Sequence, residues 1–156
     1  FDPELNESYV PYVLETSIGL DRMFLAVFSN SLQEEELDNG TTRTVLKIPA
    51  VLAPNKVAVL PLLKRDGLPE VAQKLVDELK WDFNVDYDEK DAVGRRYRRQ
   101  DAAGTPFCVT IDHQTLEDDT VTIRHRDTMD QQRVKLSEVK DIISKEVDMR
   151  YWLQKI

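Results

Sequence analysis

The stretch at residues 93–111, VGRRYRRQDAAGTPFCVTI, carries the clearest pattern of secondary structure in this chain. Its first part predicts a helix to about Ala102, which Asp91 can cap and Gly104 can terminate. From Thr105 to Ile111 the side chains alternate, as they do in a strand with two different faces. One face of that strand carries Phe107, Val109 and Ile111, and the other carries Cys108 and Thr110. A helix followed by a strand is the repeating unit of α/β domains.

Similar signals lie on both sides of this unit. Upstream are a short apolar strand from Val57 to Leu60, a helix that opens at Gly67-Leu68-Pro69, and a strand from Phe83 to Tyr87. Downstream are a strand from Thr120 to Arg126, with Thr122, Arg124 and Arg126 on one face, and an amphipathic helix built on Leu136, Val139 and Ile143 and extending toward Trp152. The order strand-helix-strand-helix-strand-strand-helix predicts a mostly parallel sheet with an antiparallel edge.

The N-terminal part has a different pattern. Residues 9–15 are rich in strand formers and predict a short strand, and residues 18–36 predict a helix that is apolar almost all round. Such a helix should be buried on several sides. Turn residues at 38–42 end this part, and residues 43–54 read as an irregular connection because Pro49 and Pro54 oppose regular structure.

Composition limits the function. The chain has 156 residues and a net charge of -8, which argues against nucleic-acid binding by a uniform surface. The charge is uneven, however, with basic residues concentrated at 95–99 and again at Arg124 and Arg126. The single cysteine, Cys108, excludes an intramolecular disulfide and is expected to pack in a strand rather than act as a nucleophile. No apolar run is long enough to span a membrane, no metal-ligand spacing occurs, and the missing start methionine predicts a fragment.

Several segments, taken in order, resemble one enzyme family. Residues 15–22, ETSIGLDR, look like motif 3 of class II aminoacyl-tRNA synthetases. Residues 52–62, LAPNKVAVLPL, together with residues 93–107 and 121–129, are similar to the anticodon-binding domain of the glycyl-tRNA synthetases. The run Gly-Arg-Arg-Tyr-x-Arg at 94–99 favours glycine over the histidine, proline and threonine enzymes, which share this domain type.

The resemblance implies a fold and a division into domains. Residues 1–50 would be the strand-helix tail of the class II catalytic domain with its linker. Residues 51–156 would be an anticodon-binding domain, an α/β fold with a five-stranded mixed sheet flanked by helices. Two other class II signature motifs are absent from the chain, so we expect the fragment alone to be inactive.

The resemblance also implies a function and site residues. The parent enzyme would be a cytoplasmic homodimer that joins glycine to tRNA(Gly) through glycyl-adenylate, using ATP and Mg²⁺. Near motif 3, ATP would contact Gly19 and Arg22, and glycine would contact Glu15 and Ser17. The anticodon loop would contact Arg98, Arg124 and Gln114, the last placed in a loop before the strand that carries Arg124.

Three of these assignments, those of Arg22, Arg98 and Arg124, have a plainer structural alternative. Arg22 could form a cap or an ion pair, and residues 95–99 could be a solvated helix face paired with Asp91 or Asp101. Arg124 could pair with acidic neighbours across the sheet. As a whole, the chain could be a non-catalytic nucleic-acid-binding accessory protein that uses the same fold. An intact Glu15-x-Ser17 with Arg22 argues against that alternative.

Overall fold

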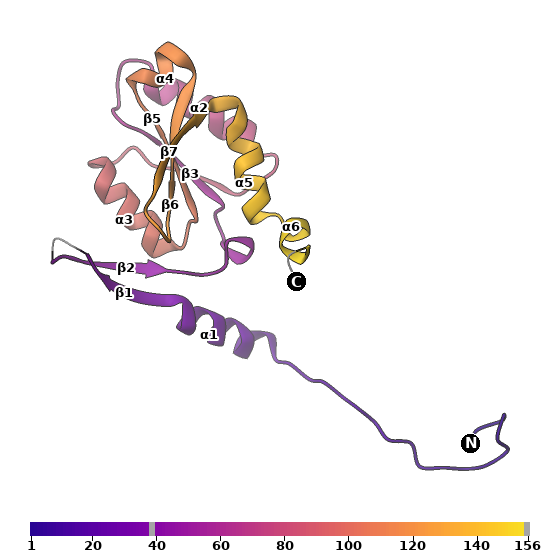
Figure 1. Ribbon diagram of the computed structural model, residues 1–156. Coiled ribbons are helices and arrows are strands. Elements are labelled where there is room, and N and C mark those ends of the chain that lie inside the picture. The colour runs from indigo at the N-terminus through magenta and orange to yellow at the C-terminus, as the bar shows by residue number, and fades with distance from the viewer. Residues whose placement is uncertain (38–39, 155–156) are drawn as a thin grey trace.

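A five-stranded sheet forms the centre of the computed structural model, which describes residues 1–37 and 40–154 (Figure 1). Its strands are β3 (Val57–Pro61), β4 (Val85–Tyr87), β5 (Phe107–Ile111), β6 (Thr120–His125) and β7 (Gln131–Lys135), in the order β4-β3-β5-β6-β7. β3 is parallel to β4 and β5, whereas β6 is antiparallel to β5 and β7. The predicted five-stranded mixed sheet is confirmed. The sheet has fewer parallel pairs than the predicted order of elements suggested, because the sequence analysis did not predict β7.

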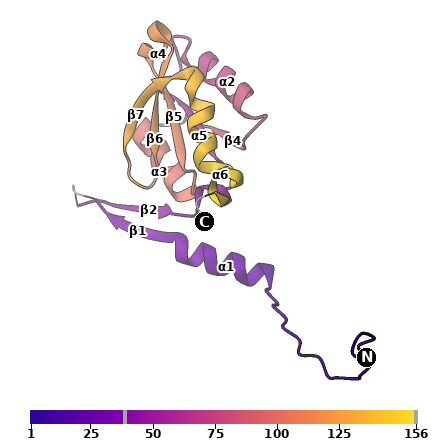
Figure 2. The same cartoon turned by 45° about the vertical axis from the view of Figure 1, so that its right-hand side comes forward.

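Helices cover both faces of this sheet. α2 (Leu68–Leu79) and α5 (Val139–Val147) lie on one face, and α3 (Val93–Ala103) lies on the other (Figures 1 and 2). The alternation in β5 is confirmed, since Val109 packs in the large core under α2 and α5, while Cys108 packs with Tyr97 of α3. Short helical segments complete the domain: α4 (His113–Asp118), η2 (Leu136–Glu138) and α6 (Met149–Leu153).

The N-terminal part differs from its prediction. α1 (Leu20–Ser31) is shorter than the expected helix, because residues 32–36 form strand β1 (Leu32–Glu36). β1 pairs antiparallel with β2 (Thr42–Leu46), which lies in the segment expected to be irregular, and η1 (Ala50–Leu52) follows. The turn predicted at 38–42 falls partly on residues 38–39, outside the described residues. The prediction was wrong here because the hairpin depends on pairing between strands, and a local pattern does not show that pairing.

Two other local predictions were also wrong. Residues 9–15 form no strand: they run as an extended tail away from the domain, and no other described segment pairs with them (Figure 1). Asp91 does not cap α3; Ala92 occupies the cap position, and the Asp91 carboxylate instead accepts a hydrogen bond from Arg99 at 2.9 Å.

α1 leaves much of its apolar surface open. Val27 packs against Leu46 and Ile48, but Phe24 and Leu25 are exposed, so the expected burial on several sides does not occur in this chain. Among the described residues, no helix has the length and apolar character needed to cross a membrane.

Candidate nucleic-acid interface

Some arginines of α3 are bound by partners within the domain, and others have guanidinium groups free to contact a ligand. The buried Arg96 guanidinium donates to the carbonyl oxygens of Pro61 at 2.5 Å and Leu62 at 3.1 Å, which fixes the chain where β3 ends. Arg99 is exposed, but it pairs with Asp88 at 2.6 Å and Asp91 at 2.9 Å. Arg96 and Arg99 are therefore engaged within the domain.

Arg98 is in a different position from its neighbours. Its side chain is 43% exposed, and its one ion pair within the described chain is a distant one, 3.8 Å from Nη1 to Oδ2 of Asp101. Arg95, one turn earlier on the same helix, is also exposed and forms no ion pair with any described residue. The two guanidinium groups make a cationic strip on the outer side of α3.

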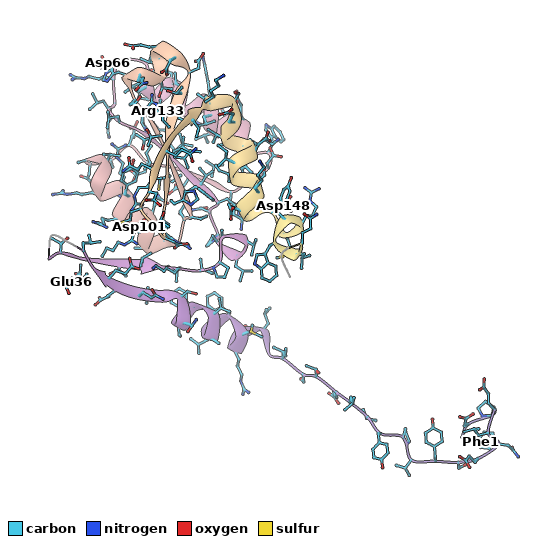
Figure 3. All side chains as sticks on the ribbon, viewed as in Figure 1. Phe1, Glu36, Asp66, Asp101, Arg133 and Asp148 are labelled. Atoms are coloured by element: carbon cyan, nitrogen blue, oxygen red, sulfur yellow. The ribbon has the colours of Figure 1, made fainter. Side chains whose placement is uncertain are left out.

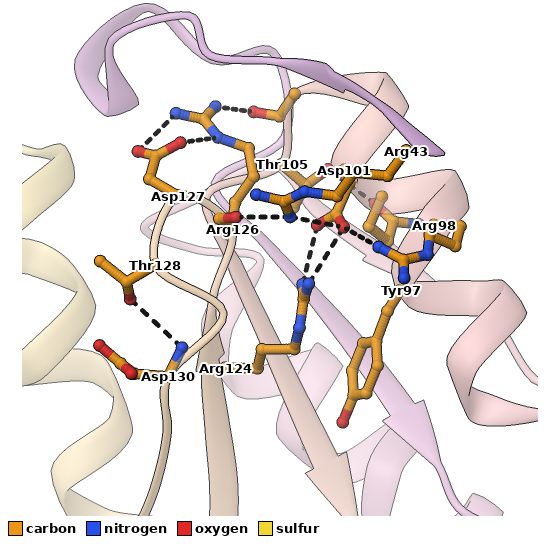
Figure 4. Close-up of polar contacts among 12 residues, drawn as sticks. Arg43, Tyr97, Arg98, Asp101, Thr105, Arg124, Arg126, Asp127, Thr128 and Asp130 are labelled. Carbon is orange, nitrogen blue, oxygen red and sulfur yellow. Dashed lines mark hydrogen bonds and ion pairs between the residues drawn. The ribbon is translucent and has the colours of Figure 1, made fainter. Parts of the chain in front are cut away.

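Asp101 gathers arginines from three elements, as Figure 4 shows. Its carboxylate is completely buried and accepts two hydrogen bonds from Arg124 of β6, at 2.8 Å to Oδ1 and 3.0 Å to Oδ2. Arg43 of β2 donates to the same Oδ2 at 3.0 Å. Together with Arg98 of α3, these residues form what we call the Asp101 cluster.

Arg124 is held inside the domain on two sides. Its side chain is 5% exposed, and its guanidinium carbon lies 4.8 Å from the centre of the Tyr97 ring, within the range of a cation–π interaction. The Tyr97 hydroxyl shares a hydrogen bond of 2.6 Å with Thr110 Oγ1. The structure thus brings Arg98 and Arg124 to one carboxylate, but only Arg98 reaches the surface.

The hairpin joins this cluster through Arg43. The Arg43 side chain is 1% exposed and also donates to Glu35 Oε2 at 2.7 Å and to the carbonyl of Arg126 at 2.9 Å. Burial opposes the charge, but the bonds to Glu35 and Asp101 raise the pKa of the Arg43 guanidinium above its ordinary value. For Glu35, the bond from Lys47, helped by Arg43 and opposed by burial, lowers the pKa of the carboxyl. Both groups are therefore charged.

Arg126 fastens the segment that follows the hairpin. It donates to the carbonyl oxygens of Gly104 at 2.8 Å and Ile48 at 2.9 Å, and it pairs with Asp127. Gly104 has a φ of +81°, and a side chain there would meet Leu46 at 3.0 Å. The segment that contains Leu46 and Ile48 thus packs closely on the C-terminal end of α3.

Positive charge exceeds negative charge in this region, although the chain is strongly acidic. The ion pairs here join five cations to three carboxylates. The cations are Arg43, Lys47, Arg98, Arg124 and Arg126, and the carboxylates are Glu35, Asp101 and Asp127. A groove of about 480 Å³ lies between β2 and α3, and Arg98 forms part of its wall. The positive excess is therefore open to solvent at the side chain of Arg98.

Gln114 lies away from this region. It is in helix α4 rather than in a loop, is exposed, and donates to Asp118 at 2.9 Å. α4 follows the carboxyl end of β5, whereas the Asp101 cluster lies near the amino end of that strand, beside the hairpin (Figures 1 and 3). The structure does not bring Gln114 together with Arg98 and Arg124.

The predicted motif 3 residues are all exposed. Gly19 is the N-cap residue of α1, Arg22 lies in its first turn, and Glu15 and Ser17 precede the helix in the extended tail. In the described part of the chain, no hydrogen bond or ion pair joins these side chains to one another. The same ranges contain no group of three or more acidic, histidine or cysteine side chains that could hold a metal ion.

Sequence reasoning missed Arg43 and the central role of Asp101. The basic run drew attention to residues 95–99, whereas Arg43 stands alone in a segment expected to be irregular. Asp101 was considered only as an ion-pair partner within its own helix. The sequence did offer one signal: Asp101 follows Arg98 by three residues, a spacing that puts both side chains on the same face of a helix.

Comparisons with known proteins agree with this architecture. Residues 56–146 match the family model described as "Anticodon binding domain". The chain is 51% identical over 147 residues to the glycine–tRNA ligase of Clostridium tetani, covering 94% of this chain and 31% of that protein. It is 54% identical over 142 residues to the ligase of Rhodopirellula baltica, covering 88% and 26%. The chain therefore spans about a third or less of the length of these curated relatives.

Two solved structures show the same fold at low sequence identity. The RNA binding domain of threonyl-tRNA synthetase from Cryptosporidium parvum has a TM-score of 0.58 at 24% identity, covering 65% of this chain and 26% of that one. Prolyl-tRNA synthetase from the same organism has a TM-score of 0.60 at 15% identity, covering 78% and 32%.

Proposed function

The chain belongs to the anticodon binding domain family, and from that premise we propose that it binds the anticodon loop of tRNA(Gly) as the C-terminal part of a glycine–tRNA ligase. The structural observation that carries the proposal is Arg98, an exposed guanidinium in a cationic region of a chain whose net charge is -8. RNA-binding proteins read unpaired loops, whose bases can be stacked and hydrogen-bonded. An arginine on the wall of an open groove suits both a base edge and a phosphate.

The contact residues expected from the sequence take different parts in this proposal. Arg98 contacts RNA directly, and Arg95 extends the cationic strip along α3. Arg124 acts as a positioning residue, because a guanidinium with 5% of its side chain exposed presents almost no surface to a ligand. Gln114 lies in α4, away from Arg98, so we assign it to a separate subsite that the anticodon loop would reach only by extending to α4.

The test is RNA binding by the 156-residue chain. Arg98→Ala should weaken binding of an anticodon stem-loop of tRNA(Gly) by about 1–3 kcal/mol and reduce discrimination against anticodon variants if the side chain reads a base. If it contacts only phosphate, binding should weaken evenly for all sequences, and the slope of log K against log salt should fall by about one. Arg150→Ala is the matched control, since this exposed arginine of α6 forms an ion pair with its neighbour Asp148 and with no other residue that the structure describes. Unchanged affinity and discrimination in a folded Arg98→Ala variant would eliminate the assignment.

The activity of the whole ligase is inferred from its relatives. We infer that the complete enzyme activates glycine with ATP and Mg²⁺ and transfers it to tRNA(Gly). We also infer that it is a cytoplasmic homodimer. In the present chain, its catalytic domain would end at residue 50 and its anticodon-binding domain would begin at residue 51. ATP supplies the phosphoanhydride bond that activates the glycine carboxylate. In this chain the Glu15 carboxylate would hold the ammonium group of glycine with Ser17 beside it, and Arg22 would contact the nucleotide where Gly19 leaves room.

These four residues fit such ligands chemically, but all four are exposed along the extended tail and the first turn of α1. We therefore expect the chain alone to form no glycyl-adenylate. Glycine-dependent exchange of pyrophosphate into ATP above background would contradict this expectation.

A further inference from the structure

The Oδ2 atom of Asp101 is shared between arginines from three elements. Arg43 and Arg124 each donate to it at 3.0 Å, while Arg98 stands 3.8 Å away, outside hydrogen-bonding range. A carboxylate oxygen has two lone pairs for in-plane donors. Arg43 and Arg124 thus saturate Oδ2, and Arg98 is left with an ion pair but no hydrogen bond.

We propose that Arg43 is a positioning residue for RNA binding, because its occupation of Asp101 Oδ2 keeps the Arg98 guanidinium out of that bond and available to RNA. This inference rests on the proposed contact between Arg98 and the anticodon loop. It adds the hairpin to the binding site, although β2 lies before residue 56, where the family match begins.

Arg43 cannot act by touching RNA. Its side chain is 1% exposed, and its donors are directed to Glu35, Asp101 and the carbonyl of Arg126. Any effect of Arg43 on RNA affinity must therefore pass through its neighbours. Among these, Asp101 is the one that also faces Arg98.

Removing Arg43 would change the competition for Asp101. Oδ2 would keep Arg124 and gain room for one more donor, and the nearest remaining cation is Arg98, three residues earlier on the same helix. A charge-assisted bond to a buried carboxylate is strong, since the alternative leaves the carboxylate undersupplied with donors. A movement of about 1 Å would bring Arg98 to the usual distance of 2.7–2.9 Å for such a bond. Arg98 would then be held inside the domain, as Arg124 is now.

The experiment is a double-mutant cycle in the 156-residue chain, with Arg43→Met, Arg98→Ala and the double variant. The probe is the anticodon stem-loop of tRNA(Gly). Arg43→Met should weaken binding about as much as Arg98→Ala, by roughly 5-fold to 150-fold. It should also lower the salt slope by about one, if Arg98 contacts phosphate, although Arg43 itself is buried. The double variant should bind no more weakly than Arg98→Ala alone.

Two further variants separate positioning from a general loss of fold. Arg133→Met removes another Arg–Asp pair, with bonds of 2.5 and 2.9 Å to Asp112, at the end of the sheet remote from the hairpin (Figure 3). It should lower the melting temperature but leave RNA affinity unchanged. Arg43→Lys keeps a charged donor for Oδ2 and should retain affinity within a few-fold.

The outcomes distinguish this proposal from the one on which it rests. Wild-type binding by Arg98→Ala would remove the proposed contact itself. A weakened Arg98→Ala with an unaffected Arg43→Met would overturn the positioning role alone, and so would losses that add in the double variant. If Arg43→Met does not fold, Arg43→Lys decides: a folded Lys variant that binds as poorly as Arg98→Ala overturns the proposal.

Discussion

Asp101→Asn should be among the most damaging single substitutions in this chain. The wild-type carboxylate is completely buried and accepts two hydrogen bonds from Arg124 and one from Arg43. Asparagine has nearly the same shape, but one oxygen becomes an amide group whose N–H donors face the guanidinium donors. Two almost fully buried guanidinium groups would lose their shared negative charge.

The magnitude follows from the burial. Removing one partner of a buried ion pair costs about 3–5 kcal/mol, because the remaining charge stays uncompensated. A domain of this size has a free energy of unfolding of about 5–15 kcal/mol, so a large share of it would be lost. At about 2–4 °C per kcal/mol, the melting temperature should fall by roughly 6–20 °C.

The assay is thermal or urea unfolding followed by circular dichroism, with Asp112→Asn as the control. Asp112 also holds an arginine by two bonds, but both partners are partly exposed, at 24% and 27%. Asparagine can still cap α4 through its remaining oxygen. The loss is then the charge and one hydrogen bond from Arg133, and because this pair is partly exposed it should cost about 1 kcal/mol or less. If Asp101→Asn and Asp112→Asn melt at the same temperature, the reasoning from burial is wrong.

The control also carries a pH signature. The hydrogen bonds from Arg133, against the effect of partial burial, lower the pKa of the Asp112 carboxyl in the folded state. The ionised Asp112 carboxylate therefore contributes its full stabilisation at pH values above the pKa of about 3.9 that it has in the unfolded chain. That stabilisation is lost as the pH falls through the lower pKa of the folded state. The difference in stability between wild type and Asp112→Asn should be constant near neutral pH and disappear in stronger acid.

Two smaller predictions test the packing around the site. Gly104→Ala should destabilise by about 1–3 kcal/mol, because a φ of +81° strains an L residue and the new Cβ would lie 3.0 Å from Leu46; Gly67→Ala, with a φ of +79° but no atom within 4 Å, should cost less. Burial raises the pKa of the Cys108 thiol to about 12, so iodoacetamide at pH 8 should modify it slowly in the native protein and rapidly in denaturant. Equal rates in both conditions would show that the thiol is accessible.

The sheet domain could be predicted from sequence because its elements carry their own signals. The apolar run of β3, the helical spacing of α2 and the alternation in β5 each follow from the burial of one face or both. The β1–β2 hairpin has no such signal. Its two strands pair along the backbone, Glu35 accepts a hydrogen bond from Arg43 across them, and Arg43 also bonds to Asp101, 58 residues away in the sequence.

The same limit explains how the candidate site was predicted in part. The alternation in β6 predicted that Arg124 shares a face with Thr122, and in the structure Arg124 lies on the face toward α3. A period of two residues says which face a side chain occupies, not how deep it lies. Depth was decided by Asp101, a fully buried carboxylate on the facing helix. The basic residues that look like one RNA-binding surface in the sequence thus have different partners in the structure. Arg96 donates to backbone carbonyl oxygens, and Arg124 neutralises Asp101. Arg98 stays exposed because Arg43 and Arg124 already occupy Asp101 Oδ2. The availability of a surface arginine therefore depends on which buried arginines compete with it, and this competition can be measured by replacing Arg43.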